Sequence, residues 1–208
     1  MCNLYSLTKG QAAIRDWFRA RHDRTGNLPL FPGIFPDQMA PIVRNGADEE
    51  RELVMARWGM PGPPQYGGAP VTNIRNLTSP HWQGWLGRRN RCIVPATSFC
   101  EYADTKPSKT PMWFALREDR PLFAFAGLWT RWRGVRGPKS GPVEGLHELF
   151  AGPRGLRPNT AERGGNHDHR FDAPGDGAAR EYWSSLDVGI GERGHRIVSV
   201  RDEGLSAI

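Results

Sequence analysis

The sequence predicts a loop-rich α+β domain in which most strands are antiparallel. Its 208 residues suit one domain that can bury a hydrophobic core. The 25 glycines and 18 prolines make up about a fifth of the chain, which favours strands and long loops over a helical bundle. The apolar runs are short and bounded by turn residues, which is typical of strands.

One amphipathic helix is expected over residues 9–22. Thr8 and Gln11 have the spacing of a capping box, in which the two side chains satisfy backbone N–H groups at a helix start. The apolar side chains that follow fall on one helical face: Ile14, Trp17 and Phe18.

Strands are expected further along the chain, after a proline-rich segment. Residues 27–41 contain four prolines and predict an extended, irregular loop. Residues 52–58 and 91–95 predict short strands. Residues 112–117 and 121–129 are separated by a charged turn, and we expect them to form a β-hairpin.

The charge and the cysteine content limit the possible partners and the cellular compartment of the protein. The net charge of +6 favours an anionic partner, with nucleic acid first, and some of the eight tryptophans are candidates for stacking on bases. No apolar run approaches 18 residues, so no membrane partner is expected. The N-terminus has no secretory pattern and the cysteines number three, which together predict a reducing cytoplasm.

Cys2 would have an unusual reactivity if Met1 is removed, because it would then be the N-terminal residue. An N-terminal cysteine carries an amine and a thiol on adjacent carbons. An aldehyde can condense with the amine, and the thiol can then close a five-membered thiazolidine ring. The alternative is that Cys2 is only a small apolar residue near the chain start.

Six segments occur in an order that resembles a known family. They are MCNLYSLTKGQAAIRDW at the start, RWGMPGPP (57–64), TNIRN (72–76), RCIVPATSFCEYA (91–103), PMWFAL (111–116) and AFAGLW (124–129). Together they resemble the SOS response-associated peptidase family, the abasic-site processing proteins. The resemblance covers residues 1–129 and extends to about Phe150.

The resemblance implies a barrel-like sheet, a DNA partner and a covalent reaction. Such proteins bind single-stranded DNA, or its junction with duplex, and trap the aldehyde of an abasic site on their N-terminal cysteine, here Cys2. Self-removal of Met1 gives the family its peptidase name. No cofactor or metal is implied. We expect a monomer in the bacterial cytoplasm that associates with the nucleoid when bound to DNA.

The resemblance also implies roles for five other residues. Glu101 matches a catalytic glutamate that assists proton transfer, and Asn73 matches an active-site asparagine. Arg75 matches a phosphate-binding arginine, whereas Trp58 and Pro36 match positions that line the DNA groove. Without the resemblance, these residue types would be an ordinary strand charge, a turn residue, a surface charge, a core residue and a loop residue.

Other chemistries remain as alternatives. A non-covalent single-stranded DNA-binding protein would use the same basic surface without Cys2. A cysteine peptidase acting on other proteins would need a histidine base, and the sequence offers no secure one. Cys92, Cys100 and His81 match no compact zinc spacing, and the pair His167 and His169 is a second weak metal pattern.

The composition changes after about residue 150. Between Ala151 and Arg180 the only large apolar side chains are those of Leu156 and Phe171. Such a segment buries little surface and predicts a basic linker or tail. A short strand is expected again near residues 197–198.

The resemblance weakens over the same stretch. The family continues with another strand, a Pro-Asn step, a catalytic histidine and a Met-Pro pair. Residues 147–150 could begin that strand and Pro158–Asn159 fit the Pro-Asn step, but the Met-Pro pair is missing. His167 lies near the expected place and is the candidate for the missing histidine.

We therefore divide the chain into a family-like domain, residues 1–150, and a divergent region, residues 151–208. One hypothesis is that a small insertion or deletion in a GC-rich gene puts the codons from about 151 out of frame. The other is a genuine divergent tail, ordered or disordered. Loss of the histidine strand would leave the core incomplete, so an inactive family member is a further functional alternative.

Overall fold

The computed structural model describes residues 3–66, 68–74, 76–103, 106–134, 146–153 and 198–200. Within them the chain forms one α-helix, three 3-10 turns and twelve strands. In order these are β1 (Tyr5–Leu7), α1 (Gln11–Phe18), β2 (His22–Asp23), β3 (Phe31–Ile34), β4 (Met39–Asn45), β5 (Arg51–Trp58), η1 (Pro64–Tyr66), β6 (Asn73–Ile74), η2 (Pro80–Trp85), η3 (Arg88–Asn90), β7 (Arg91–Ala96), β8 (Ser98–Ala103), β9 (Thr110–Ala115), β10 (Phe123–Arg133), β11 (Leu146–Pro153) and β12 (Val198–Val200).

Five strands close into a barrel. They pair in the order β5-β4-β7-β10-β11, and the barrel closes because β11 also pairs with β5. The closing pair is parallel and the other four are antiparallel. Closure removes the unpaired sheet edges of these strands. The predicted α+β class with a barrel-like, predominantly antiparallel sheet is therefore confirmed.

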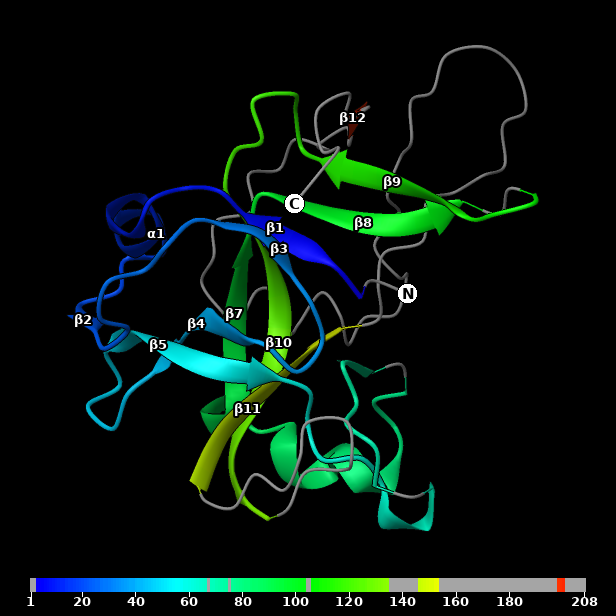
Figure 1. Cartoon of the computed structure of the whole chain (residues 1–208). Coiled ribbons are helices and arrows are strands. Elements are labelled where there is room, and N and C mark those ends of the chain that lie inside the picture. Colours follow the sequence, from blue (N-terminus) through cyan, green and yellow to red (C-terminus); the bar gives the residue numbers. More distant parts are fainter. Residues whose placement is uncertain are drawn as a thin grey trace.

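A second sheet lies over one end of the barrel, at the top of Figure 1. Its strand order is β12-β9-β8-β1-β3, and every pairing within it is antiparallel. Aromatic side chains join the two sheets. Tyr5 of β1 packs edge-on against Trp58 of β5, with ring centroids 5.1 Å apart, and Phe99 of β8 contacts Phe125 of β10.

One face of the barrel strands points into the barrel. The guanidinium of Arg44 on β4 lies 3.8 Å from the centre of the Trp129 ring on β10, although β7 separates these two strands. The same face of these strands carries Ile42, Val54 and Val94, which are all buried, so it faces the interior of the barrel. The β10–β7 register places Gly127 opposite Cys92 on the same inward face. Ile42, Cys92 and Phe150 on this face are at most 1% exposed, so the middle of the barrel is tightly packed.

Gly127 is required by this packing. A Cβ at that position would lie 2.8 Å from the Cys92 sulfur and 3.1 Å from the Ala151 carbonyl oxygen. We expect Gly127→Ala to lower the free energy of unfolding by about 1–3 kcal/mol, the usual cost of overpacking. Chemical unfolding followed by tryptophan fluorescence measures this. Gly84→Ala is the control, because a Cβ there has nothing within 4 Å, and an equal loss in both variants would contradict the packing argument.

The helix is shorter than predicted. It spans Gln11–Phe18 rather than 9–22, because Arg19 adopts a left-handed backbone with φ 53° and ends it. The amide of Ala20 then donates to the Arg15 carbonyl, which satisfies part of the helix end. Residues 22–23 form strand β2, which pairs with β5.

The predicted capping box is wrong. The helix begins after Gly10, and no side chain caps it. The Thr8 hydroxyl instead bonds to Thr97 at 3.1 Å, and the Gln11 amide donates to Asp23 at 2.6 Å. Contacts with residues distant in the sequence have replaced the local cap.

The predicted β-hairpin is also wrong. Strand β9, which overlaps the first predicted segment (112–117), pairs with β8 and β12 in the upper sheet. Strand β10, which overlaps the second predicted segment (121–129), pairs with β7 and β11 in the barrel. The charged turn between them therefore joins two sheets. The Arg117 side chain is bonded to Asp119 within that turn.

Other expectations for the fold stand closer to the structure. The strands expected at 52–58 and 91–95 are present as β5 and β7. Residues 27–41 are less irregular than predicted, because they contain β3 and the start of β4. The strand suggested at residues 147–150 is part of β11, and that near 197–198 corresponds to β12. Of the predicted divergent region, the structure describes only 151–153 and 198–200.

Candidate functional site

The candidate site lies where the chain enters β1. Strand β1 pairs with β8 so that Tyr5 lies opposite Phe99, and the Cys100 amide donates to the Leu4 carbonyl at 2.8 Å. Continuing this register by two residues places Asn3 opposite Glu101. Cys2 lies outside the described residues, but it directly precedes Asn3 in the chain.

A short polar chain connects Asn3 to β6. The Thr72 hydroxyl donates to the Asn3 side-chain oxygen at 3.4 Å. The Asn73 side-chain amide donates to the same hydroxyl at 3.1 Å. Asn73 is buried, although its side chain is polar. The structure therefore brings the start of β1 and the predicted site residue Asn73 together.

The Thr72 backbone is held from two sides. Its carbonyl accepts one hydrogen bond from the Trp58 indole at 3.0 Å and one from the Gly152 amide at 3.0 Å. Strand β6 also pairs with β11, with Asn73 opposite Gly152. These bonds attach the site segment to the closing strands of the barrel, so its backbone is pre-positioned rather than a free loop.

Trp58 supports the site through its hydrogen bond to the Thr72 carbonyl. Only 3% of its surface is exposed, and its ring stacks on Phe150 with an angle of 10° between the planes. An indole this buried presents no face on which a DNA base could stack. Its contribution in this structure is to pack the core and to bind the Thr72 carbonyl.

Pro36 lies on an exposed turn beside Trp58. The turn connects β3 to β4, and the Asp37 amide donates to the Trp58 carbonyl at 2.9 Å. Phe35 and Met39 flank the turn and are 48% and 42% exposed. Exposed apolar side chains of this kind can pack against unstacked bases.

Glu101 is partly exposed on β8 and lies opposite Met112 of β9. Its carboxylate is carried by a strand that is paired on both sides, since β8 lies between β1 and β9. A partly exposed carboxylate on such a rigid support can exchange protons with a bound molecule.

The other two cysteines are poor nucleophiles. Cys92 and Cys100 are each 1% exposed. Burial raises the pKa of both thiols above the ordinary value, because a thiolate is destabilised away from water. Both thiols therefore stay protonated and inaccessible at neutral pH. Cys92 lies on β7 and Cys100 on β8.

The metal patterns find no support in the described part of the chain. His81 lies on η2, and its ring nitrogen is 2.9 Å from the Pro61 carbonyl oxygen. Among the described residues, no three metal-ligating side chains come together. Within the same residues no helix is both long and apolar enough to cross a membrane. Arg75, His167 and His169 lie outside the described residues.

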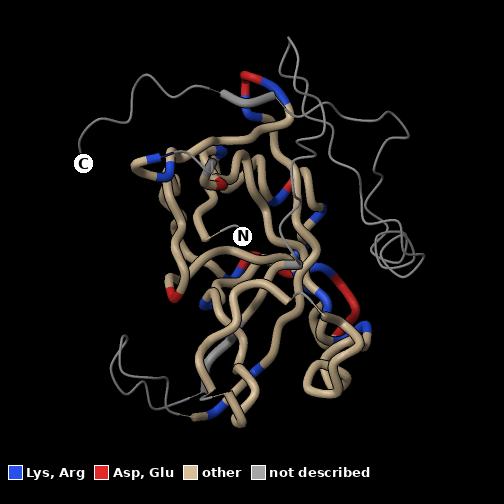
Figure 2. Tube along the Cα trace, turned by 90° about the vertical axis from the view of Figure 1, so that its right-hand side faces the viewer, with Lys and Arg blue, Asp and Glu red and all other residues tan. Residues whose placement is uncertain are grey.

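Basic residues are scattered along the described chain rather than confined to one segment (Figure 2). The sequence reasoning missed Asn3 and Thr72 as members of the site. Both were adjacent to chosen residues, Cys2 and Asn73, and both have polar side chains. The missing signal was the pairing of β1 with β8, which determines what Asn3 approaches.

Comparison with known proteins identifies the family of this chain. A sequence model of the SOS response associated peptidase (SRAP) family matches residues 1–147. The chain belongs to this family. The SRAP match includes every described residue of the candidate site: Asn3, Trp58, Thr72, Asn73 and Glu101.

Two related proteins carry descriptive names. The abasic site processing protein YobE of Bacillus subtilis is 34% identical over 111 residues, which cover 50% of this SRAP chain and 49% of YobE. The abasic site processing protein YoqW of the same organism is 33% identical over 111 residues, covering 50% and 48%. The chain spans about half the length of the curated relatives it matches.

Solved structures share the fold of this chain. A protein from Bordetella bronchiseptica has a TM-score of 0.58 at 22% identity, covering 96% of this chain and all of that one. A protein from Bacteroides thetaiotaomicron has a TM-score of 0.53 at 19% identity, covering 73% and 67%. At these identities the likeness concerns the fold.

Proposed function

We propose that this SRAP protein binds abasic sites in single-stranded DNA and captures them covalently through Cys2 once Met1 is removed. The capture serves the DNA damage response. The observation that carries the proposal is the hydrogen bond from the Thr72 hydroxyl to Asn3, the residue after Cys2, together with the bond from Asn73 to the same hydroxyl. The β1–β8 register, continued by two residues, would bring Glu101 opposite Asn3. The names of the two Bacillus relatives support the choice of lesion.

The chemistry requires two bond-forming steps. The α-amine of Cys2 attacks the aldehyde carbon of the ring-opened abasic sugar, and loss of water leaves a C=N bond. The Cys2 thiol then adds to that carbon, and its proton goes to the nitrogen, which closes the thiazolidine. Glu101 donates a proton to the departing hydroxyl as a general acid. Asn73 orients the reacting groups, Arg75 binds a backbone phosphate, and Pro36 contacts the DNA on the apolar turn.

Comparison of the three cysteines favours Cys2 as the reacting residue. Cys92 and Cys100 are buried with raised thiol pKa values, and neither has an adjacent amine on its own residue. Thiazolidine formation needs both groups on neighbouring carbons. Cys2 can supply both, which makes removal of Met1 by hydrolysis of the Met1–Cys2 bond a precondition. We assign this removal to the protein itself.

A crosslinking assay tests the proposal. The purified protein is incubated with an oligonucleotide that carries one abasic site and is run on a denaturing gel. We expect a shifted, heat-stable band for the wild type and none for Cys2→Ala, while Cys100→Ala, which removes a different thiol, keeps the band. Intact mass should show loss of Met1 in the wild type.

Other outcomes identify the alternatives. Equal bands for wild type and Cys2→Ala would overturn capture through Cys2. Absence of a covalent band, with retained mobility shift on a native gel, would indicate a non-covalent single-stranded DNA-binding protein. Absence of both would indicate an inactive family member, as expected if the missing histidine strand is essential and His167 does not replace it.

A further inference from the structure

A hydrogen bond between distant residues reaches the start of the chain. Asn3 is exposed and lies just before strand β1. The Thr72 hydroxyl donates to its side-chain oxygen at 3.4 Å, and the two residues are 69 positions apart in the sequence. Among the residues that the structure describes, no other hydrogen bond to the Asn3 side chain is formed. The contact exists because the fold brings the start of β1 close to the start of β6.

The backbone on both sides of Thr72 is fixed. Before it, Val71 exchanges two backbone hydrogen bonds with Met60, each 2.9 Å long. Met60, two residues after the end of β5, is completely buried. After Thr72, Asn73 pairs with Gly152 of β11. The Thr72 side chain therefore projects from a backbone that the barrel holds in place, and the position of its hydroxyl is defined.

The proton of the Thr72 hydroxyl is directed toward Asn3. A hydroxyl group has one proton to donate and lone pairs that accept. The Asn73 side-chain amide donates to the Thr72 oxygen at 3.1 Å, and the hydroxyl proton goes to the Asn3 oxygen. This second bond is longer than the usual value of about 2.8 Å between two oxygens. We therefore expect it to affect the position of Asn3 more than the stability of the fold.

Asn3 is the residue that connects Cys2 to the fold. The Leu4 carbonyl accepts a hydrogen bond from the Cys100 amide at 2.8 Å, which fixes the backbone one residue further along the chain. The bond from Thr72 holds the next residue outward, Asn3. Since neighbouring Cα atoms are about 3.8 Å apart, the position of Asn3 restricts where the Cys2 amine can lie.

We infer that Thr72 is a positioning residue for the capture of the abasic site. Its hydroxyl holds Asn3, and Asn3 in turn limits the directions from which the Cys2 amine and thiol approach the aldehyde carbon. Thr72 exchanges no proton with the DNA and forms no bond to it. Positioning of this kind matters because a displacement of about 1 Å can slow a reaction about 100-fold. The role rests on the proposed function, in which Cys2 is the reacting residue.

The variant Thr72→Val tests this role, because valine keeps the branched shape and lacks the hydroxyl. We expect the single-turnover rate of crosslinking at saturating abasic-site DNA to fall about tenfold or more. The DNA concentration that gives half of the maximal rate should stay within about twofold of the wild-type value, since Thr72 serves the reaction and not the binding of DNA. Thr72→Ser restores the hydroxyl and should recover most of the rate. A serine variant as slow as the valine variant would overturn the inference.

Thr78→Val is the matched control. Thr78 is exposed on the segment that follows β6, and its hydroxyl donates to the Asn76 side chain at 2.6 Å within a local turn. The variant makes the same chemical change away from Asn3 and should keep the wild-type rate. Thermal unfolding checks that both valine variants are folded. An equal fall in rate in the two folded valine variants would count against a specific role of Thr72.

A double-mutant cycle tests whether Thr72 acts through Asn3. Asn3→Ala removes the oxygen that accepts from the Thr72 hydroxyl. Once this acceptor is absent, adding Thr72→Val should slow crosslinking by less than about twofold further, because residues that act through one contact are not additive. If the two single effects multiply in the double variant, Thr72 and Asn3 act independently and the inference is wrong.

A measurement without DNA separates the contact from the reaction. In protein labelled with nitrogen-15, the heteronuclear NOE of the Asn3 backbone amide reports motion on the picosecond to nanosecond scale. We expect a lower value in Thr72→Val than in the wild type, and a wild-type value in Thr72→Ser. An unchanged value in Thr72→Val would overturn the contact itself. The expected NOE pattern in a wild type that forms no crosslink would support the contact and refute the proposed function, so the two failures are distinguishable.

Discussion

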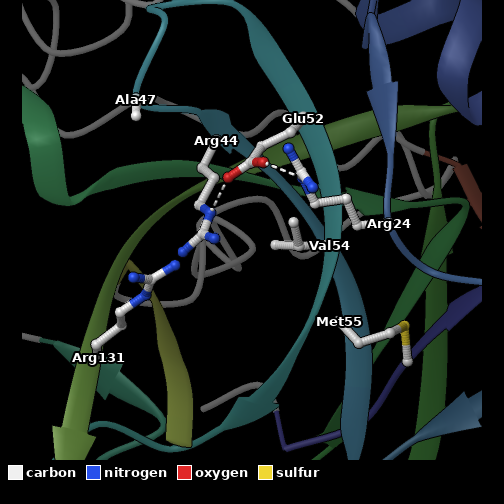
Figure 3. Close-up of a pocket in the computed structure, with 7 residues that line it drawn as sticks. All are labelled: Arg24, Arg44, Ala47, Glu52, Val54, Met55 and Arg131. Atoms are coloured by element: carbon white, nitrogen blue, oxygen red, sulfur yellow. Dashed lines mark hydrogen bonds and ion pairs between the residues drawn. The ribbon is translucent and has the colours of Figure 1, made fainter.

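Replacing Glu52 by glutamine is expected to lower the free energy of unfolding by about 3–5 kcal/mol. The Glu52 side chain is 8% exposed and the Arg44 side chain 4%. Removing the carboxylate charge takes the Glu52 ion pair, which Figure 3 shows, away from the buried Arg44 guanidinium. Small domains have only about 5–15 kcal/mol of stability, so the variant should unfold at much lower denaturant. Urea unfolding followed by tryptophan fluorescence measures the difference.

The neighbouring Glu50 provides the matched control. It pairs with Arg21 at 3.3 Å, but the two side chains are 46% and 71% exposed. Exposed ion pairs contribute about 0–1 kcal/mol, so Glu50→Gln should have almost no effect. Similar losses in Glu50→Gln and Glu52→Gln would show that burial of the Arg44 pair is not the cause.

A double variant separates the ion pair from the packing. Arg44→Met combined with Glu52→Leu removes both charges and keeps apolar volume in the barrel. Since replacing a whole buried ion pair is often neutral, this variant should be considerably more stable than Glu52→Gln. If it is not, the packing of these side chains matters more than their charges.

The sequence predicted the class of the fold and several of its strands because local patterns carry that information. The segments of β5 and β7 are short apolar runs, and such runs form strands in many contexts. Strand partners are a different matter. The segments of β9 and β10 resemble a hairpin locally, yet β9 joins the upper sheet and β10 the barrel. Pairing is decided by contacts between residues far apart in the chain, which no local pattern reports.

The same distinction explains the outcome for the site. Asn73 and Glu101 became candidates because motifs carry them, and the structure connects Asn73 through the Thr72 hydroxyl to Asn3. The link from Thr72 to Asn3 depends on how β1 and β6 are placed in space, so it could not be predicted. Arg44 and Glu52 resemble solvent-facing charges in the sequence, and only closure of the barrel reveals that they are buried.

Glu101→Gln is expected to slow crosslinking to an abasic site by about 10²- to 10⁴-fold, the usual contribution of a general acid. This expectation rests on the proposed function. Glutamine keeps the size of the side chain but cannot donate the proton that the departing hydroxyl needs. Single-turnover rates from denaturing gels measure the effect. Glu118→Gln, on the exposed turn after β9, removes the same charge and should leave the rate unchanged.

Binding must be separated from chemistry for this result to be informative. A tetrahydrofuran analogue of the abasic site has no aldehyde and reports binding only. If Glu101 acts as a general acid, Glu101→Gln should bind this analogue as tightly as the wild type while its crosslinking rate falls. Parallel losses in both would make Glu101 a DNA contact instead. An unchanged crosslinking rate would remove Glu101 from the reaction and leave proton transfer to another group near Asn3.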